Sequence, residues 1–150
     1  MMRDKLSNAM KDAMKAKEAR RLSTVRLIQT AIKDRDIANR GLGKDPVSDD
    51  DILQILQKMI KQREESAKIY SEGGREELAE QEREEITIIR GFMPEQMSDD
   101  QVLEACKGVI AEISAQGLRD MGKCISVLKE RYAGQMDFAK ASAMVKDLLK

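Results

Sequence analysis

The side chains that could do chemistry in this chain are two cysteines, many carboxylates and many cations, because its 150 residues contain no histidine. Without histidine the chain lacks the commonest general base and the commonest transition-metal ligand. It also contains no GxxxxGK[ST] loop, no GxGxxG pattern and no GxSxG elbow. The sequence therefore predicts no catalytic residue, no metal ion and no cofactor, so an autonomous active site is not expected.

The two thiols stand apart from each other in the sequence and from any metal-ligand pattern. Cys106 and Cys124 show no CxxC spacing and imply no disulfide framework. Cys106 lies within an apolar helical stripe, which predicts a small buried hydrophobe. Cys124 follows Gly122 and Lys123 near an expected helix start, where a thiolate is favoured. Because no partner base is available, we interpret Cys124 as a partly buried, inert side chain.

Three consecutive acids, Asp49, Asp50 and Asp51, admit two interpretations. They follow Ser48, so they can occupy the first turn of a helix, where the helix dipole and free amides stabilise negative charge. The alternative is a divalent-metal site. Three adjacent side chains point in three directions on a helix, however, and no fourth acid stands at a ligand-like spacing. We expect the helix start.

Positive and negative charges are separated along the chain, although the formal net charge is zero. Residues 1–44 hold twelve Lys and Arg against five Asp and Glu, a net charge of +7. Residues 45–104 carry a net charge of −10, and residues 105–150 carry +3. This arrangement could steer an anionic partner to one side of the molecule. Alternatively, the two oppositely charged segments pack against each other.

Helices must position these side chains, because apolar residues recur at spacings of three and four and no segment alternates with period two. The first, second and fourth expected helices cover residues 2–17, about 19–38 and 75–90. The third begins at Ser48 and ends at Gly73-Gly74, and the fifth ends at Gly117. The sixth runs from near Asp120 to Gly134, and the last follows Asp137. On the second helix Arg26, Lys33 and Arg40 repeat every seven residues and therefore share a face. The sequence predicts an all-α protein.

The stretch ITIIRGFMPEQMSDDQ, residues 86–101, ends one helical run and begins another. Gly91 can adopt the left-handed conformation that stops a helix, and Pro94 removes a backbone donor. Ser98 and Gln101 have the spacing of a capping box. The apolar residues in this stretch, Phe92, Met93 and Met97, indicate a packed joint. We predict two domains, residues 1–93 and 94–150, with a candidate hinge between them.

The composition also bears on location. No window approaches the ~18 consecutive apolar residues of a membrane span, and MMRDKLSNAM lacks the apolar core of a signal peptide. The default expectation is a cytoplasmic protein without a membrane partner.

Four stretches in this order resemble a known family: the amphipathic N-terminal start with RLSTVRLIQTAIKDR, KMIKQREESAKIYSEGGREELAEQEREEITII, GFMPEQMSDDQ and LRDMGKCISVLKER. Together they cover nearly the whole chain and resemble the YqeY-like proteins of the GatB/YqeY family. The resemblance implies a larger N-terminal helical bundle with long helices, joined to a smaller three-helix C-terminal domain.

The resemblance also implies kinship with the tail domain of the B subunit of the Asp/Glu-tRNA amidotransferase. In that enzyme the tail contacts tRNA, while the glutamine-dependent chemistry lies in other domains and another subunit. This sequence resembles the tail alone. The carbon–nitrogen ligase label, with glutamine as amido-N-donor, is therefore a family association that the residues of this chain do not support as an independent activity.

Three groups of residues match the family's motifs. Arg26 lies in TVRLI, Arg63 and Glu64 lie in KQREES, and Met121-Gly122-Lys123 belong to DMGK. A glycine and free amides at a helix start, beside a lysine, suit an anion. The competing interpretation is that Gly122 only permits tight helix packing. Arg63 is interpreted as a partner in a structural ion pair with Glu64 or with the acidic fourth helix.

Two hypotheses of function remain. The first is a helical RNA-interaction module that engages tRNA, or a tRNA-handling complex, by shape and phosphate contacts, since the chain has only four aromatic residues. Its candidate nucleic-acid-binding residues are Arg20, Arg21, Arg26, Lys33, Arg119, Gly122, Lys123, Lys129 and Arg131. The second is a protein–protein adaptor without a nucleic-acid partner, because Met-rich apolar faces adapt to varied partners.

Overall fold

The computed structural model describes residues 1–150 and contains seven α-helices, one short 3₁₀-helix and no strand, which confirms the all-helical prediction. The elements are α1 (Met2–Ala16), α2 (Ala19–Gly41), α3 (Asp49–Glu72), α4 (Glu76–Arg90), α5 (Asp99–Glu112), η1 (Leu118–Asp120), α6 (Met121–Arg131) and α7 (Phe138–Leu149). No helix combines the length and the apolar composition that a membrane span requires.

The chain divides into two compact units, which we call unit 1 (Met1–Met93) and unit 2 (Pro94–Lys150). Unit 1 contains α1 to α4, and unit 2 contains α5, η1, α6 and α7. Each unit has a separate cluster of buried apolar side chains. Phe92 and Met93 pack against the cluster of unit 1, whereas Met97 packs against that of unit 2.

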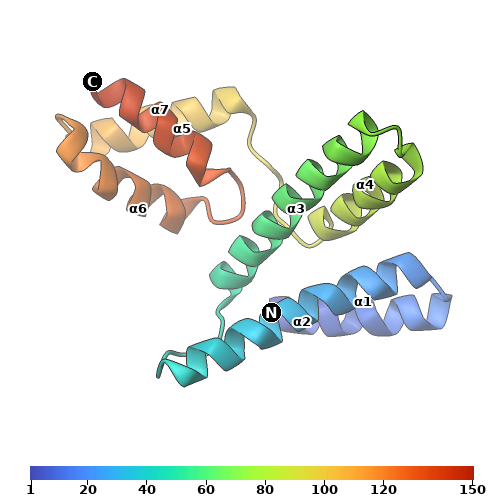
Figure 1. Cartoon of the computed structure of the whole chain (residues 1–150). Helices are drawn as coiled ribbons and strands as arrows, with labels where there is room; N and C mark the ends of the chain where they lie inside the picture. Colours follow the sequence, from blue (N-terminus) through green and yellow to red (C-terminus); the bar gives the residue numbers. More distant parts are fainter. The chain divides into compact units, whose positions relative to one another are not determined.

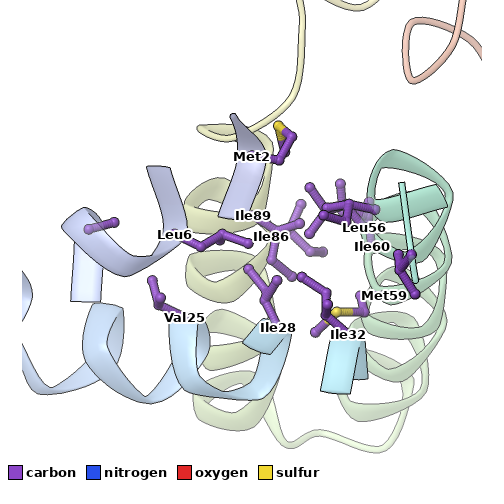
Figure 2. Close-up of a cluster of buried hydrophobic side chains, with 13 residues drawn as sticks. Met2, Leu6, Val25, Ile28, Ile32, Leu56, Met59, Ile60, Ile86 and Ile89 are labelled. Atoms are coloured by element: carbon purple, nitrogen blue, oxygen red, sulfur yellow. The ribbon is translucent and has the colours of Figure 1, made fainter. Parts of the chain in front are cut away.

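Unit 1 consists of two helical pairs, α1 with α2 and α3 with α4, whose members lie side by side (Figure 1). All four helices contribute to its core, in which Leu6, Ile28, Leu56 and Ile89 are almost completely buried. Figure 2 shows side chains from the four helices directed toward a common centre. Such burial of branched aliphatic groups is the main stabilising contribution expected here, at roughly 25 cal/mol per Å² of apolar surface.

Unit 2 packs α5, α6 and α7 around a smaller core. Cys106, Leu128 and Val145 come from these three helices and are fully buried. Cys106 thus serves as a small buried hydrophobe, as predicted from its place in an apolar stripe. The segment before α5 is held to the connection between α6 and α7, because Met97 N donates to Gln135 O at 2.9 Å.

Two predicted helix starts are capping boxes. Ser48 Oγ accepts a hydrogen bond from Asp51 N, and the Asp51 carboxylate accepts one from Ser48 N at the start of α3. Ser98 and Gln101 exchange the corresponding pair of bonds at the start of α5. The three adjacent acids therefore begin a helix, where Asp51 caps the backbone.

The glycine at the end of α4 does not act as predicted. Gly91 has a right-handed conformation, with φ −60° and ψ −19°, and the expected left-handed stop is wrong. Its amide donates to both Thr87 O and Ile88 O, so the helix tightens as it ends. A Cβ at this position would lie 3.2 Å from Ile88 O. A side chain at this position would make a tight contact with that carbonyl, while the φ value itself is one that any residue adopts.

Three other predictions differ from the structure. The second helix continues past Ala38 to Gly41, which keeps Arg40 helical. The fifth helix ends at Glu112, well before Gly117, because Ser114 takes the left-handed conformation and Ala115 N donates back to Ile110 O. This non-glycine stop returns Ala115 to the core of unit 2. The spacing of Leu6, Met10 and Met14 also predicts that all three share the apolar stripe of the first helix, but Met14 is 51% exposed.

Candidate functional site

The predicted cations of unit 1 fall into two groups. Arg20 pairs with Glu84 at 3.5 Å and Arg21 pairs with Glu18 at 3.8 Å, both at exposed positions where such pairs contribute little. Arg26 and Lys33 are exposed on α2 and form no ion pair or side-chain hydrogen bond. They lie two turns apart, about 10 Å along the helix axis, and their charges are free for a partner.

The predicted cations of unit 2 divide in the same way. Arg131 makes a bidentate ion pair with Glu112, in which Nη1 lies 2.5 Å from Oε2 and Nη2 lies 2.6 Å from Oε1. Its guanidinium therefore already has a partner within unit 2. This guanidinium lowers the pKa of Glu112. Arg119, Lys123 and Lys129 are exposed and have no ion pair. Lys129 follows Lys123 by six residues, which places the two lysines on different faces of α6.

Arg119, Gly122 and Lys123 lie where the 3₁₀-helix η1 leads directly into α6. A Cβ at Gly122 would meet no atom within 4 Å, so packing inside the unit does not require this glycine. The interpretation of Gly122 as a tight helix-packing residue therefore has no support here. Its backbone is exposed between two free cations. Asp120 is also present, and its carboxylate accepts a hydrogen bond from Gln116 N.

The segment GLRDMGKC, residues 117–124, has the GxxxxGK spacing of a phosphate-binding loop, with cysteine in place of the final Ser or Thr. The structure excludes that fold. Leu118–Asp120 form a 3₁₀-helix where the motif needs an open loop, and the segment follows α5 where the motif needs a strand. Cys124 is fully buried, so its thiol is not available to a bound cation.

Arg63 and Glu64, which match a family motif, form structural ion pairs as predicted. Arg63 Nε lies 2.8 Å from Glu85 Oε2 on α4, and Arg63 Nη1 donates to Met59 O. Glu64 pairs with Arg90 at 3.0 Å. Both pairs join α3 to α4. Glu82 lies beside the first pair, where burial, followed by the charge of Glu85, raises the pKa of its carboxyl.

Both thiols are buried and poorly suited to nucleophilic chemistry. Burial raises the pKa of Cys106, with the second thiol as a smaller cause. Burial also raises the pKa of Cys124, with Asp120 as a smaller cause. Since the thiolate is the reactive form, these shifts oppose reactivity at neutral pH.

Sequence reasoning missed two hollows on unit 1. One runs along α2 and has a volume of about 370 Å³; it is lined by Ala19, Leu22, Ser23, Arg26, Leu27 and Thr30. The other, of about 490 Å³, lies where the α1–α2 turn meets α4 and includes Arg20, Thr87 and Ile88. Ala19 lines both, so they adjoin. The available signal was Leu27, an apolar residue outside the buried stripe of α2.

Comparison with known proteins now decides the family. The family model described as Yqey-like protein matches residues 3–149. The chain belongs to the YqeY-like family. This confirms the resemblance seen in the four sequence stretches, and the match extends over both units of this YqeY-like chain.

Related proteins of fungi show similarity to much of the chain. A protein of Pyrenophora tritici-repentis named Altered inheritance of mitochondria protein 41, mitochondrial, is 27% identical over 134 residues, which cover 85% of this chain and 71% of that protein. The protein of the same name from Saccharomyces cerevisiae strain YJM789 is 31% identical over 88 residues, 59% of this chain and 46% of its own length. An uncharacterised Schizosaccharomyces pombe protein is 32% identical over 88 residues, 59% of this chain and 68% of its own.

These comparisons contradict the predicted cytoplasmic location, because the named relatives are mitochondrial proteins. The prediction rested on the lack of an apolar span and of a secretory signal. Neither absence distinguishes one aqueous compartment from another, so the inference was wrong. The chain spans less than half the length of the Saccharomyces relative.

Proposed function

We propose that this YqeY-like protein is a helical RNA-interaction module that contacts tRNA, or a tRNA-handling complex, through exposed cations. The observation that carries the proposal is that Arg26, Lys33, Arg119, Lys123 and Lys129 expose charges that no acid of the chain neutralises. The group at the start of α6 is the proposed main contact. Arg119 and Lys123 flank the exposed backbone of Gly122 there, and a phosphate fits beside a residue without a side chain.

The contact is with phosphates and RNA shape, because the chain offers no exposed ring for a base to stack on. Its four aromatic residues are all partly buried. Phe92 packs against the core of unit 1, and Tyr132 and Phe138 pack against the core of unit 2. Single-stranded RNA is normally held by stacking on aromatic side chains. A folded RNA that presents its backbone is therefore the better fit.

We further propose that the two units are the two domains of the family, a bundle of long helices and a small three-helix domain. The ligase activity associated with the amidotransferase is not proposed for this chain alone. Its carboxylates are engaged in caps and ion pairs or lie on helix surfaces, and both thiols are buried. The chain is proposed to hold RNA, while any chemistry belongs to another protein.

A filter-binding titration of the purified chain with tRNA tests this function. Saturable binding is expected at low salt, with a steep loss of affinity as salt rises, because phosphate contacts release counterions. The double variant Arg119→Glu/Lys123→Glu is expected to weaken binding by at least about tenfold. Lys140→Glu/Lys146→Glu on α7 changes the net charge by the same amount and is the charge-matched control in the same unit.

Two results would reject the function. The first is the absence of tRNA binding at low salt. The second is an equal loss of affinity in the α6 variants and in the control, which would show that only the net charge of the chain matters. Circular dichroism of each variant verifies that its helices remain formed.

A further inference from the structure

One face of α2 combines exposed apolar and cationic side chains, and RNA binding does not account for the apolar ones. The opposite face of the helix is buried in unit 1 through Thr24, Val25, Ile28 and Ile32. The exposed face carries Ala19, Leu22, Ser23, Arg26, Leu27 and Thr30, which line a hollow of about 370 Å³. Leu27 is 47% exposed. We call this hollow, with the one that adjoins it at Ala19, the α2 groove.

The length of the α2 groove suits a short partner helix. Ala19 and Thr30 are eleven residues apart, so the first hollow follows about three turns of α2, or about 16 Å. The second hollow extends the groove to Thr87 and Ile88 of α4. An amphipathic partner helix buries apolar side chains at the same three- and four-residue spacings. A groove of this length would accept three or four of them.

The charge around the groove is positive. Arg26 lines it without an ion-pair partner, and Lys33 continues the same face two turns further along α2. Arg20 and Arg21 border the second hollow. The acids that line it are Glu18 and Glu84, each already within 4 Å of one of these arginines, and Asp34 follows Leu27 by seven residues on the same face of α2. The complementary occupant therefore carries acidic side chains about two turns apart.

A partner protein fits this surface better than RNA or a second copy. Exposed leucine gains nothing from a phosphate backbone, whereas it is favourably buried by an apolar helix face. The chain's own most acidic helix is α4, and its apolar residues Ala79, Ile86 and Ile89 are already buried in unit 1. The most acidic helix of a second copy therefore has no free apolar face to offer.

We propose that the α2 groove binds an acidic amphipathic α-helix of a partner protein. Leu22 and Leu27 receive its apolar side chains, and Arg26 and Lys33 receive its carboxylates. This inference goes beyond RNA binding, because it assigns the unit 1 cations Arg26 and Lys33 to a protein partner and leaves the main RNA contact at the start of α6 in unit 2. One chain can thus hold both an RNA and a protein.

The test uses the full chain and synthetic peptides of about 18 residues, long enough for a short amphipathic helix. The first peptide places Leu at three- and four-residue spacings and Glu two turns apart. The second has Lys in place of every Glu, and the third is a scramble of the first. Fluorescence anisotropy of labelled peptides is expected to give at least about tenfold tighter binding for the first peptide than for the others.

Variants of the chain locate the site. Leu27→Asp and Arg26→Glu are each expected to weaken binding of the first peptide about tenfold, as at other anchoring contacts. Ile69→Asp is the matched control, because Ile69 is an exposed apolar residue on α3, outside the α2 groove. Arg119→Glu/Lys123→Glu in unit 2 is expected to leave peptide affinity unchanged, which separates this site from the RNA contact.

Several results would overturn the proposal. Equal binding of the scrambled peptide would show non-specific association, and an equal loss in Ile69→Asp would place the contact elsewhere. If Leu27→Asp and Arg26→Glu weaken tRNA binding while no peptide binds, the α2 face belongs to the RNA surface instead. Far-ultraviolet circular dichroism verifies that each variant is folded, and Arg26→Glu, at an exposed position, keeps the test valid if Leu27→Asp unfolds.

Discussion

The ion pair of Arg63 and Glu85 joins α3 to α4 and is less exposed than the pair of Arg90 and Glu64 between the same helices. The two side chains are only 14% and 19% exposed, and the Nε–Oε2 distance is 2.8 Å. Removal of Arg63 would take away the positive charge beside Glu85 and the neighbouring Glu82, at a site with little exposure to solvent. Loss of one partner of a buried pair is far more costly than loss of an exposed pair.

We therefore predict that Arg63→Met lowers the free energy of unfolding by about 2–3 kcal/mol, somewhat less than for fully buried pairs. Arg90→Met is the control, because Arg90 pairs with Glu64 between the same helices while both side chains are more than half exposed. It is expected to cost less than about 1 kcal/mol. Urea denaturation of both variants provides the comparison, and equal losses would contradict the assignment.

Asp36 provides a pH-dependent contact within unit 1. Both oxygens of its carboxylate accept hydrogen bonds from Arg3 at 2.9 Å, and Oδ1 also accepts one from Val47 N at 2.8 Å. The Arg3 bonds, followed by the Val47 bond, lower the pKa of Asp36, and the Arg40 charge adds a smaller contribution. Folding therefore favours the ionised form. Its stabilisation is present above the ordinary carboxyl pKa and is lost as pH falls through the lowered value.

The variant Asp36→Asn tests this linkage. The stability gap between the natural chain and the variant is expected to be largest at neutral pH and to shrink toward about pH 3 and below. Urea denaturation at several pH values measures the gap. A gap that is constant with pH would mean that the charge of Asp36 is not what stabilises this contact.

At the residue scale, the sequence was informative where a local rule specifies the role. The spacing of Ser98 and Gln101 predicted the capping box of α5, and the apolar neighbours of Cys106 predicted its burial. The partners of single charges could not be predicted, because they depend on which helices meet. Thus the sequence did not pair the candidate RNA contact Arg131 with Glu112, and Arg63 was interpreted as structural without Glu85 being identified.

At the element scale, the start of α5 depends on its capping box. Ser98 Oγ accepts from Gln101 N at 3.2 Å, which satisfies one of the free amides of the first turn. We predict that Ser98→Ala lowers the stability of unit 2 by about 1 kcal/mol. Ser126→Ala within α6 removes an exposed hydroxyl that caps nothing, so it is expected to change stability by less than about 0.5 kcal/mol.

Chemical denaturation followed by circular dichroism measures both variants. Equal behaviour of the two serines would show that the cap contributes nothing measurable. The comparison is made in the full chain, so that the environment of both helices is unchanged.

Helix starts were predicted better than helix ends. Starts are marked by side chains that bond to the backbone, as at Ser48, Ser98 and Asp137. Ends depend on where the chain must turn back to the core, which is a tertiary property. Ser114 therefore ends α5 in a left-handed conformation that its residue type does not announce, and Gly91 ends α4 without one.

At the scale of the whole molecule, the two cores lead to a prediction about fragments. Residues 1–93 and residues 94–150 are each expected to fold cooperatively when expressed alone, because each fragment retains its complete apolar cluster. Within the second fragment, Gln96 Nε2 still donates to Gly134 O at 2.7 Å and holds the N-terminal segment. Sigmoidal urea transitions are expected for both, and two unstructured fragments would contradict the division into domains.

The all-helical class and the family could be predicted from the whole sequence, because helical periodicity and ordered motifs extend along nearly its full length. The α2 groove could not. Leu27 and Ala19 have the sequence pattern of ordinary helical residues, and only the packing of α2 shows that their face is not covered by the other helices of unit 1. The location was mistaken because composition alone does not identify a compartment.

Phosphate binding at the start of α6 is measured most directly by the salt dependence of tRNA affinity. The neutral double variant Arg119→Ala/Lys123→Ala is expected to reduce the slope of log affinity against log salt by about two, one for each lost phosphate contact. Lys146→Ala is expected to leave the slope unchanged. A slope that stays the same in the double variant, or that falls equally in the control, would contradict the account.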